Sequence, residues 1–165
     1  MIQIDKNKNG YAILELLFYI AFFALLSIVT INAMIAMAQS FKETEVQTSL
    51  LRSGAIMERI SREIRLADSI NLISASSLKL NTTDSSGNAK TVQFSLSGAN
   101  AQFFENDALT GNLNAPDIIV SSLTFTEITT TEGKGIKVIL TVQSENDKYS
   151  RAVDFYDTVV LRGNY

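Results

Sequence analysis

Two missing residue types limit the chemistry open to this 165-residue chain. It has no cysteine, so it can form neither a disulfide bond nor a thiolate metal site. It has no histidine, the residue that most often serves as a general base or a metal ligand. A hydrolase built from carboxylates would still be conceivable, but no paired acidic site stands out. We therefore expect a protein that is not an enzyme and that needs no cofactor.

The acidic and amide side chains show no spacing typical of a catalytic or metal site. Asp154 and Asp157 fall in the expected last strand, but their positions differ in parity, so they point to opposite faces of an ideal strand. The oxygen-bearing loop residues that could bind Ca²⁺ are Asp84, Asn106, Asp107, Asn112 and Asn114. No EF-hand spacing connects them, and ordinary turn chemistry accounts for their positions. We expect no metal site.

The chain also lacks an excess of positive charge. Its formal net charge is -3 at pH 7, whereas affinity for phosphates needs clustered Lys and Arg. One segment holds several arginines, namely Arg52, Arg59, Arg62 and Arg65. Glu58 and Glu63 are interleaved with them, which favours a solvated helix face over a nucleic-acid patch. We therefore do not expect nucleic acid as a partner.

What the chain does have is a long apolar run near its N-terminus. From Leu16 to Phe41 there is no charged residue and no proline. About 20 apolar residues at about 1.5 Å each are enough to cross the core of a bilayer. Lys6 and Lys8 precede the run, and the positive-inside rule keeps such a basic leader in the cytoplasm. The pattern predicts a single-pass membrane helix with the C-terminal part outside.

Glu15 lies directly before this run and is the one charged residue from Tyr11 to Phe41. A carboxylate at the centre of a membrane helix costs roughly 2.5–3.5 kcal/mol on insertion scales, and less toward an end. Such a residue usually has a partner and a function. The simpler interpretation is that Glu15 lies at the membrane interface, where the positive end of the helix dipole favours an anion.

The order of residues around Glu15 resembles the prepilin signature of the type IV pilin superfamily. A polar leader ends at Gly10, the aromatic Tyr11 follows, then three apolar residues, Glu15 and a membrane-length helix. Two details differ from the family pattern: Ala12 stands where a small hydroxylated residue is common, and no proline kinks the apolar helix. The missing proline favours a minor pilin or pseudopilin over a major pilin.

The resemblance implies a role for each of these residues. Prepilin peptidase would recognise Gly10, cleave after it and N-methylate Tyr11, whose amine stays basic. Glu15 would then pair with the Tyr11 amine of a neighbouring subunit as a filament grows. Two alternatives stay open: Gly10 is a simple linker, or a secretory signal peptidase cuts after Ala38 in the Ala36-Met37-Ala38 segment.

The rest of the chain predicts an α+β fold in four parts: a leader at 1–10, a membrane or filament-core helix at 11–41, its amphipathic continuation at 42–68, and an antiparallel β domain at 69–165. One apolar stripe marks the continuation, formed by Val46, Leu50, Met57, Ile60, Ile64 and Ala67. Gly54 lies inside this helix at a cost of about 1 kcal/mol against alanine, either for close packing or as a weak point.

Roughly six short strands are expected after residue 68. The alternation is clearest at Ile136, Val138, Leu140 and Val142. Turns are expected at 84–88, 97–100, 131–135 and 144–148, and residues 105–117 read as loop because they are rich in turn formers. Asp157 interrupts the apolar face of the last strand, which suggests a bulge or an edge. The stripe at 46–67 can cover the apolar strand faces, as in the pilin lollipop.

The function that the resemblance implies is structural. The chain would be a minor pilin or pseudopilin of a type IV pilus or type II secretion-like filament, with other pilin subunits, prepilin peptidase and the membrane as its partners. It would lie in a bacterial or archaeal-type cell membrane and pass into a cell-surface or periplasmic filament. The alternative is a single-pass membrane protein whose exterior β domain binds a ligand, as an adhesin or DNA-uptake component would.

Overall fold

The computed structural model describes residues 8–130 and 133–161, and the predicted leader therefore lies mostly outside the described residues. The chain divides into two units, Met1–Thr44 and Glu45–Tyr165. The first unit is helical, and the second contains the end of that helix, a short second helix and all eight strands. An α+β fold with a long N-terminal helix and an antiparallel β domain is confirmed.

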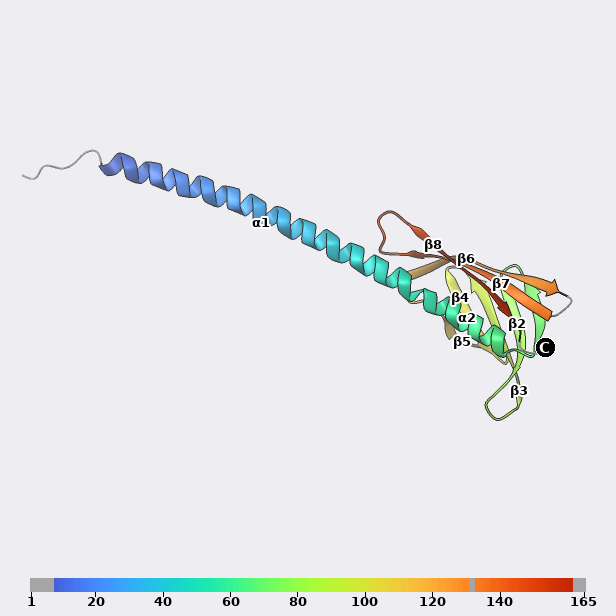
Figure 1. Ribbon diagram of the computed structural model, residues 1–165. Helices are drawn as coiled ribbons and strands as arrows, with labels where there is room; N and C mark the ends of the chain where they lie inside the picture. Colours follow the sequence, from blue (N-terminus) through green and yellow to red (C-terminus); the bar gives the residue numbers. More distant parts are fainter. Residues whose placement is uncertain (1–7, 131–132, 162–165) are drawn as a thin grey trace, which may run out of the picture. The chain divides into compact units, whose positions relative to one another are not determined.

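The helix α1 runs from Lys8 to Arg52 without a break (Figure 1). Its apolar part contains no proline, and its hydroxyl side chains bond back to the helix itself. The Oγ of Ser27 donates to the carbonyl of Phe23 at 2.8 Å, and the Oγ1 of Thr30 donates to that of Leu26 at 2.8 Å. These hydroxyls are therefore satisfied without water. The helix is long and apolar enough to span a membrane.

A short interruption at Ser53 separates α1 from α2, which spans Gly54–Leu66. Ser53 keeps right-handed helical dihedral angles, φ -63° and ψ -21°. Its N–H is shared between the carbonyls of Ser49 and Leu50, both at 3.2 Å, and its hydroxyl also donates to Ser49 at 3.1 Å. These bonds tighten the turn before Gly54. The single helix expected through residue 68 is thus two helices, and the second ends at Leu66.

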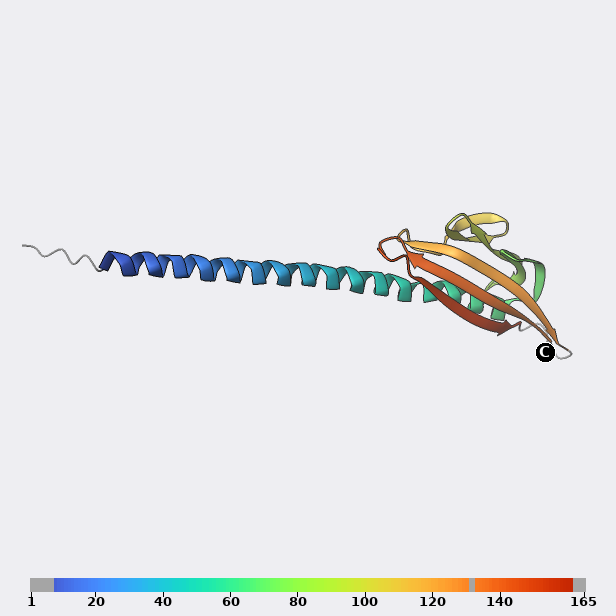
Figure 2. The ribbon, with the colours of Figure 1, turned by 90° about the horizontal axis from the view of Figure 1, so that it is seen from above.

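Five strands form the first sheet, and three form the second (Figure 1, Figure 2). The first sheet contains β1 Ser69–Ser74, β2 Ser77–Thr83, β3 Ala89–Ser97, β4 Asn100–Glu105 and β5 Ala108–Asn112. The second contains β6 Ile118–Thr130, β7 Gly133–Ser144 and β8 Ala152–Val160. Every pair is antiparallel and joins strands that are consecutive in the sequence. The order is therefore β1 to β5 in one sheet and β6 to β8 in the other.

The apolar stripe and the alternating strands meet in one core. Ile60 and Ile64 of α2 are fully buried, as are the four β7 residues that alternate most clearly in the sequence. Val46 and Leu50, at the end of α1, belong to the same core. The prediction that this stripe covers the strands is confirmed.

The expected turns are mostly confirmed, but two strands were missed. Gly98 has φ 58° in the two-residue turn between β3 and β4, and Gly87 has φ 81° in the turn after β2. Part of the expected turn at 131–135 lies outside the described residues. The reading of 105–117 as loop is wrong, because β5 forms there and pairs with β4 through a bulge. The other missed strand is β1, for which the sequence pattern gave no signal. The strand β6 is one long strand with a bulge between Val120 and Ser122.

Candidate functional site

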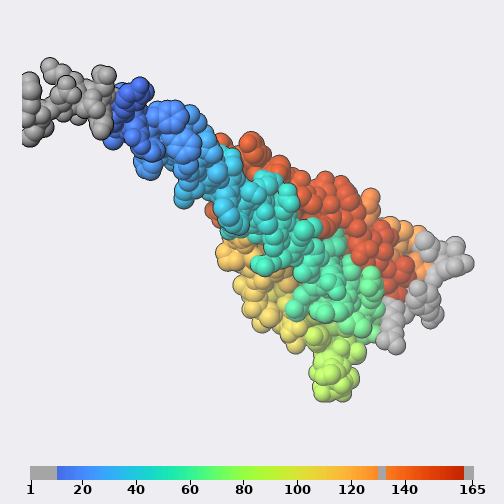
Figure 3. Space-filling model, turned by 60° about the vertical axis from the view of Figure 1, so that its left-hand side comes forward, coloured from blue at the N-terminus to red at the C-terminus, as the bar shows by residue number. Residues whose placement is uncertain are grey.

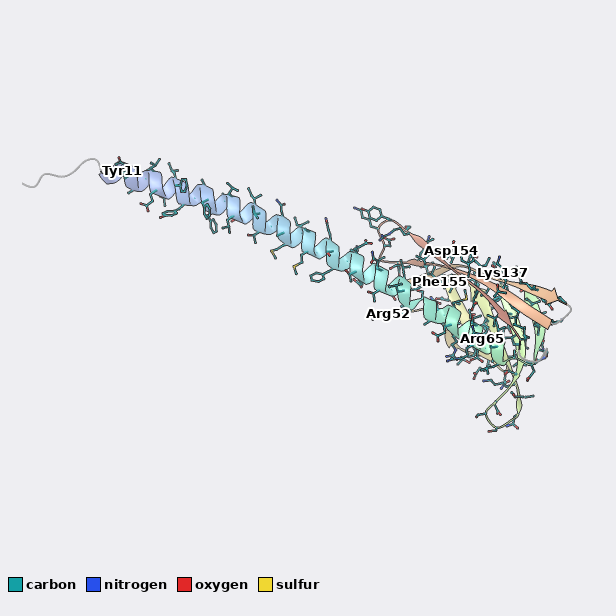
Figure 4. The ribbon with its side chains drawn as sticks, viewed as in Figure 1. Tyr11, Arg52, Arg65, Lys137, Asp154 and Phe155 are labelled. Carbon is teal, nitrogen blue, oxygen red and sulfur yellow. The ribbon has the colours of Figure 1, made fainter. Side chains whose placement is uncertain are left out.

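The predicted processing site lies in the first turns of α1. The helix begins at Lys8, so Gly10 already has helical backbone. Proteolysis needs extended backbone, and cleavage after Gly10 therefore requires the first turn to unwind. Tyr11 follows and is exposed, with a relative accessibility of 75% for the residue (Figure 4). Glu15 lies four residues further along, on the same helix face as Tyr11.

Glu15 has a hydrogen-bond partner that the sequence analysis did not assign. The hydroxyl of Tyr19 donates to the Oε1 of Glu15 at 2.9 Å. Tyr19 stands one helical turn after Glu15, a spacing at which side chains on a helix meet. In an apolar surrounding this bond partly compensates the carboxylate for its lost hydration. The spacing of a tyrosine four residues after a membrane carboxylate was the signal that could have found it.

The segment from Tyr11 to Phe41 has an uncovered apolar surface. All of its side chains are exposed except that of Ser27, which is half-buried. An apolar surface of this length is unfavourable in water and must be covered by lipid or by other protein. The geometry of this segment therefore suits a membrane, a bundle of like helices, or each in turn.

The acidic residues of β8 point to opposite faces, as their parity predicts. Asp157 faces α2, where its Oδ2 accepts a hydrogen bond from the hydroxyl of Ser61 at 2.5 Å and lies 4.0 Å from the Nη2 of Arg65. Asp154 accepts a bond from the hydroxyl of Tyr156 at 3.0 Å, which raises the pKa of that tyrosine. Figure 4 labels Asp154 and Arg65. The two carboxylates therefore do not form a dyad. The strand β8 lies at an edge of its sheet, which is one of the two expectations drawn from the position of Asp157.

The loop residues considered for Ca²⁺ do not converge. Asp84 accepts the backbone N–H groups of Ser86 and Asn88, both at 2.8 Å, and hydrogen bonds from Asn88 lower its pKa. Asp107 forms an ion pair with Lys79 at 2.6 Å. Asn114 is buried, and its amide bonds to the carbonyl of Ile118 at 2.7 Å. Across the part of the chain that the structure describes, no group of His, Cys, Asp and Glu could hold a metal ion.

The loop between β7 and β8 is built on Asp147, which the sequence analysis did not single out. Its carboxylate is buried and accepts bonds from the backbone N–H groups of Tyr149, at 3.1 Å, and Arg151, at 2.8 Å. The Arg151 guanidinium bonds the same carboxylate, with its Nε at 2.8 Å and its Nη2 at 3.1 Å. The guanidinium and these backbone bonds hold the pKa of Asp147 well below its usual range. An anionic Asp147 therefore fixes this loop.

The four arginines of the helical segment do not act as one patch. Arg65 approaches Asp157, and Arg59 lies over the ring of Phe103 with its guanidinium carbon 4.6 Å from the ring centroid. Arg52 and Arg62 are exposed. The arrangement differs from the continuous basic stripe that phosphate backbones need.

Comparison with known proteins adds no family assignment. No family model, curated protein or solved structure matches this chain.

Proposed function

We propose that this protein is a structural subunit of a type IV filament, either a minor pilin or a type II secretion-like pseudopilin. The observation that supports this best is the segment 11–41 of α1. It is apolar, its side chains are uncovered, and its one charge is Glu15 near the start. A subunit of this kind is stored in the membrane by the segment and then packs it against the same segment of other subunits.

Glu15 and Tyr11 are the assembly residues in this proposal. Cleavage after Gly10 gives Tyr11 a free α-amine, and N-methylation keeps that amine basic. Two opposite unit charges about 4 Å apart attract each other by about 4 kcal/mol at an effective dielectric constant of 20. The Tyr11 amine of one subunit and the Glu15 carboxylate of the next would thus stabilise each other in the apolar filament core. Before assembly, the Tyr19 hydroxyl occupies one oxygen of the carboxylate.

The first experiment determines the N-terminus of the mature protein. The protein is purified from its own membrane, and its intact mass and N-terminal peptide are measured. The proposal expects a chain that begins at Tyr11 with one added methyl group. A chain that begins at Met1, Ile2 or after Ala38 would instead describe a plain anchored or secreted β domain, and the proposal would be wrong.

The second experiment separates a filament subunit from a plain anchor. Glu15→Ala removes the carboxylate, and Tyr19→Phe is the matched control that removes only the hydroxyl bonded to it. Incorporation into filaments should be lost in Glu15→Ala and kept in Tyr19→Phe. Membrane insertion of Glu15→Ala should be at least as efficient as in the wild type, because a charge has been removed. Equal incorporation of all three chains would contradict the assembly role.

A further inference from the structure

Two arginines line a pocket of about 360 Å³ in the β-domain unit. The pocket lies between residues 49–59 of the helical segment and residues 112–118, which contain the connection from β5 to β6. Figure 3 shows the turquoise helical residues beside the yellow segment. The volume is at the lower end of the range for ligand pockets, which starts at about 300 Å³. The side chains that the argument uses are Ser49, Arg52, Ile56, Arg59, Leu113 and Asp117.

Among the described residues, the guanidinium groups at this pocket have no acidic partner. Within residues 8–130 and 133–161, no carboxylate lies at ion-pair distance from Arg52 or Arg59. Arg59 packs its guanidinium against the Phe103 ring, and its Nε is buried without a hydrogen-bond acceptor. A buried donor that lacks an acceptor is unfavourable by about 1–3 kcal/mol. Because the Nε has almost no accessible surface, an acceptor oxygen in the pocket would meet this guanidinium at its terminal Nη groups.

The charge and shape of the pocket indicate which anion it takes. Asp117 is the one carboxylate in the lining, and its Oδ2 accepts a short bond of 2.6 Å from the hydroxyl of Ser49. Two arginines and one aspartate leave a net charge of one positive unit, which matches a monoanion better than a phosphate dianion. Ile56 and Leu113 add apolar wall, which suits the methylene groups that carry a carboxylate in a small acid or a glutamate side chain.

We propose that this pocket binds a carboxylate, with the guanidinium groups of Arg52 and Arg59 as its recognition elements. Guanidinium and carboxylate groups match in charge and planar geometry, and their hydrogen bonds are among the stronger ones in proteins. The source of the carboxylate is either a free small acid or an acidic side chain of a partner protein. The inference holds for a filament subunit and for a plain anchored protein alike.

The test is a titration of the full chain in detergent micelles, followed by NMR of the arginine Nε–Hε groups. The probes are N-acetyl-glutamate methylamide, its neutral glutamine counterpart, propionate and inorganic phosphate. Arg52→Gln is the test variant, and Arg62→Gln is the matched control, since Arg62 is exposed on α2 and does not line the pocket. The amide spectrum of each variant verifies that the domain is folded.

The expected result is a saturable shift of the Arg59 Nε signal with the blocked glutamate and none with the blocked glutamine. Arg52→Gln should weaken this binding about tenfold, as the loss of one charge-assisted hydrogen bond predicts, and Arg62→Gln should leave it unchanged. Saturation by propionate at the same concentrations assigns a small acid, and saturation by the blocked glutamate alone assigns a protein side chain. No saturation, equal binding of phosphate, or equal effects of the two variants would overturn the proposal.

Discussion

Replacing Gly54 with alanine should stabilise the β-domain unit, although Gly54 lies in a close contact between α2 and β8. A Cβ at this position would lie 3.4 Å from the Cε1 of Phe155 and 4.0 Å from its Cζ. Both distances are ordinary van der Waals contacts, so the ring does not have to move. Figure 4 labels Phe155 on β8. An alanine side chain therefore fits at position 54. The sequence analysis left two interpretations of Gly54 open, namely close packing and a weak point in the helix.

The expected gain comes mainly from the backbone. Glycine in a helix interior is about 1 kcal/mol less favourable than alanine, because the unfolded chain loses more conformational freedom. Gly54 is the first residue of α2, but Ser53 before it keeps helical dihedral angles. The position therefore resembles a helix interior more than a free helix end. We expect Gly54→Ala to raise the free energy of unfolding by about 0.5–1 kcal/mol.

The measurement is urea unfolding of the full chain in detergent micelles, followed by near-ultraviolet circular dichroism. Gly135→Ala is the matched control, because a Cβ on Gly135 in β7 would lie 3.3 Å from the backbone oxygen of Val159, which cannot move aside as a side chain can. Gly135→Ala should therefore lower the free energy of unfolding. If Gly54→Ala lowers it as well, α2 and β8 pack more tightly than these distances state, and the reasoning is refuted.

Three further predictions use the same unfolding measurement. The hydrogen bond between Ser61 and Asp157 should give a coupling of about 1–2 kcal/mol in a double-mutant cycle with alanine, and additive effects would contradict it. Ile60→Ala should lower the free energy of unfolding by about 2–5 kcal/mol because the side chain is fully buried. Leu51 is exposed, and Leu51→Ala should change the free energy of unfolding by less than about 0.5 kcal/mol. Similar losses in the two variants would contradict the burial of Ile60 in the core. Because the pKa of Asp147 is lowered, its contribution is complete above about pH 4 and is lost as the pH falls further. Asp147→Asn should remove this part of the acid dependence of the free energy of unfolding. If the variant has the same pH profile as the wild type, Asp147 does not make this contribution.

The sequence was most informative where burial is periodic. The stripe from Val46 to Ala67 and the alternation in β7 both fall in the core, because each pattern repeats with the period of its element. Turns that need a positive φ were also found, since glycine marks them, as at Gly87 and Gly98. The division of the strands into two sheets has no comparable local signal, because it depends on which edges meet in space.

The elements that were missed lack such a period. Most side chains of β5 are exposed, so no apolar alternation distinguishes it from a loop, and its pairing with β4 also contains a bulge. Side-chain contacts were predictable only at fixed helical spacing, as between Glu15 and Tyr19. The contact of Arg59 with Phe103 joins α2 to β4, which are far apart in the sequence. Such contacts, and the pocket beside them, follow from the tertiary fold alone.

The pairing of each strand with its neighbour in the chain has a consequence for how the β domain is made. Within each sheet, a new strand needs only a short loop to close against the strand before it, so each sheet can grow in the order in which the chain emerges. The helix α2, however, comes before all the strands, and its most extensive backbone contact with a strand is with β8, the last of them. A growing chain therefore exposes part of its apolar helix face until the final strand is complete. Truncation before Ala152 should leave part of that face open to proteases and chaperones, because β8 is then missing.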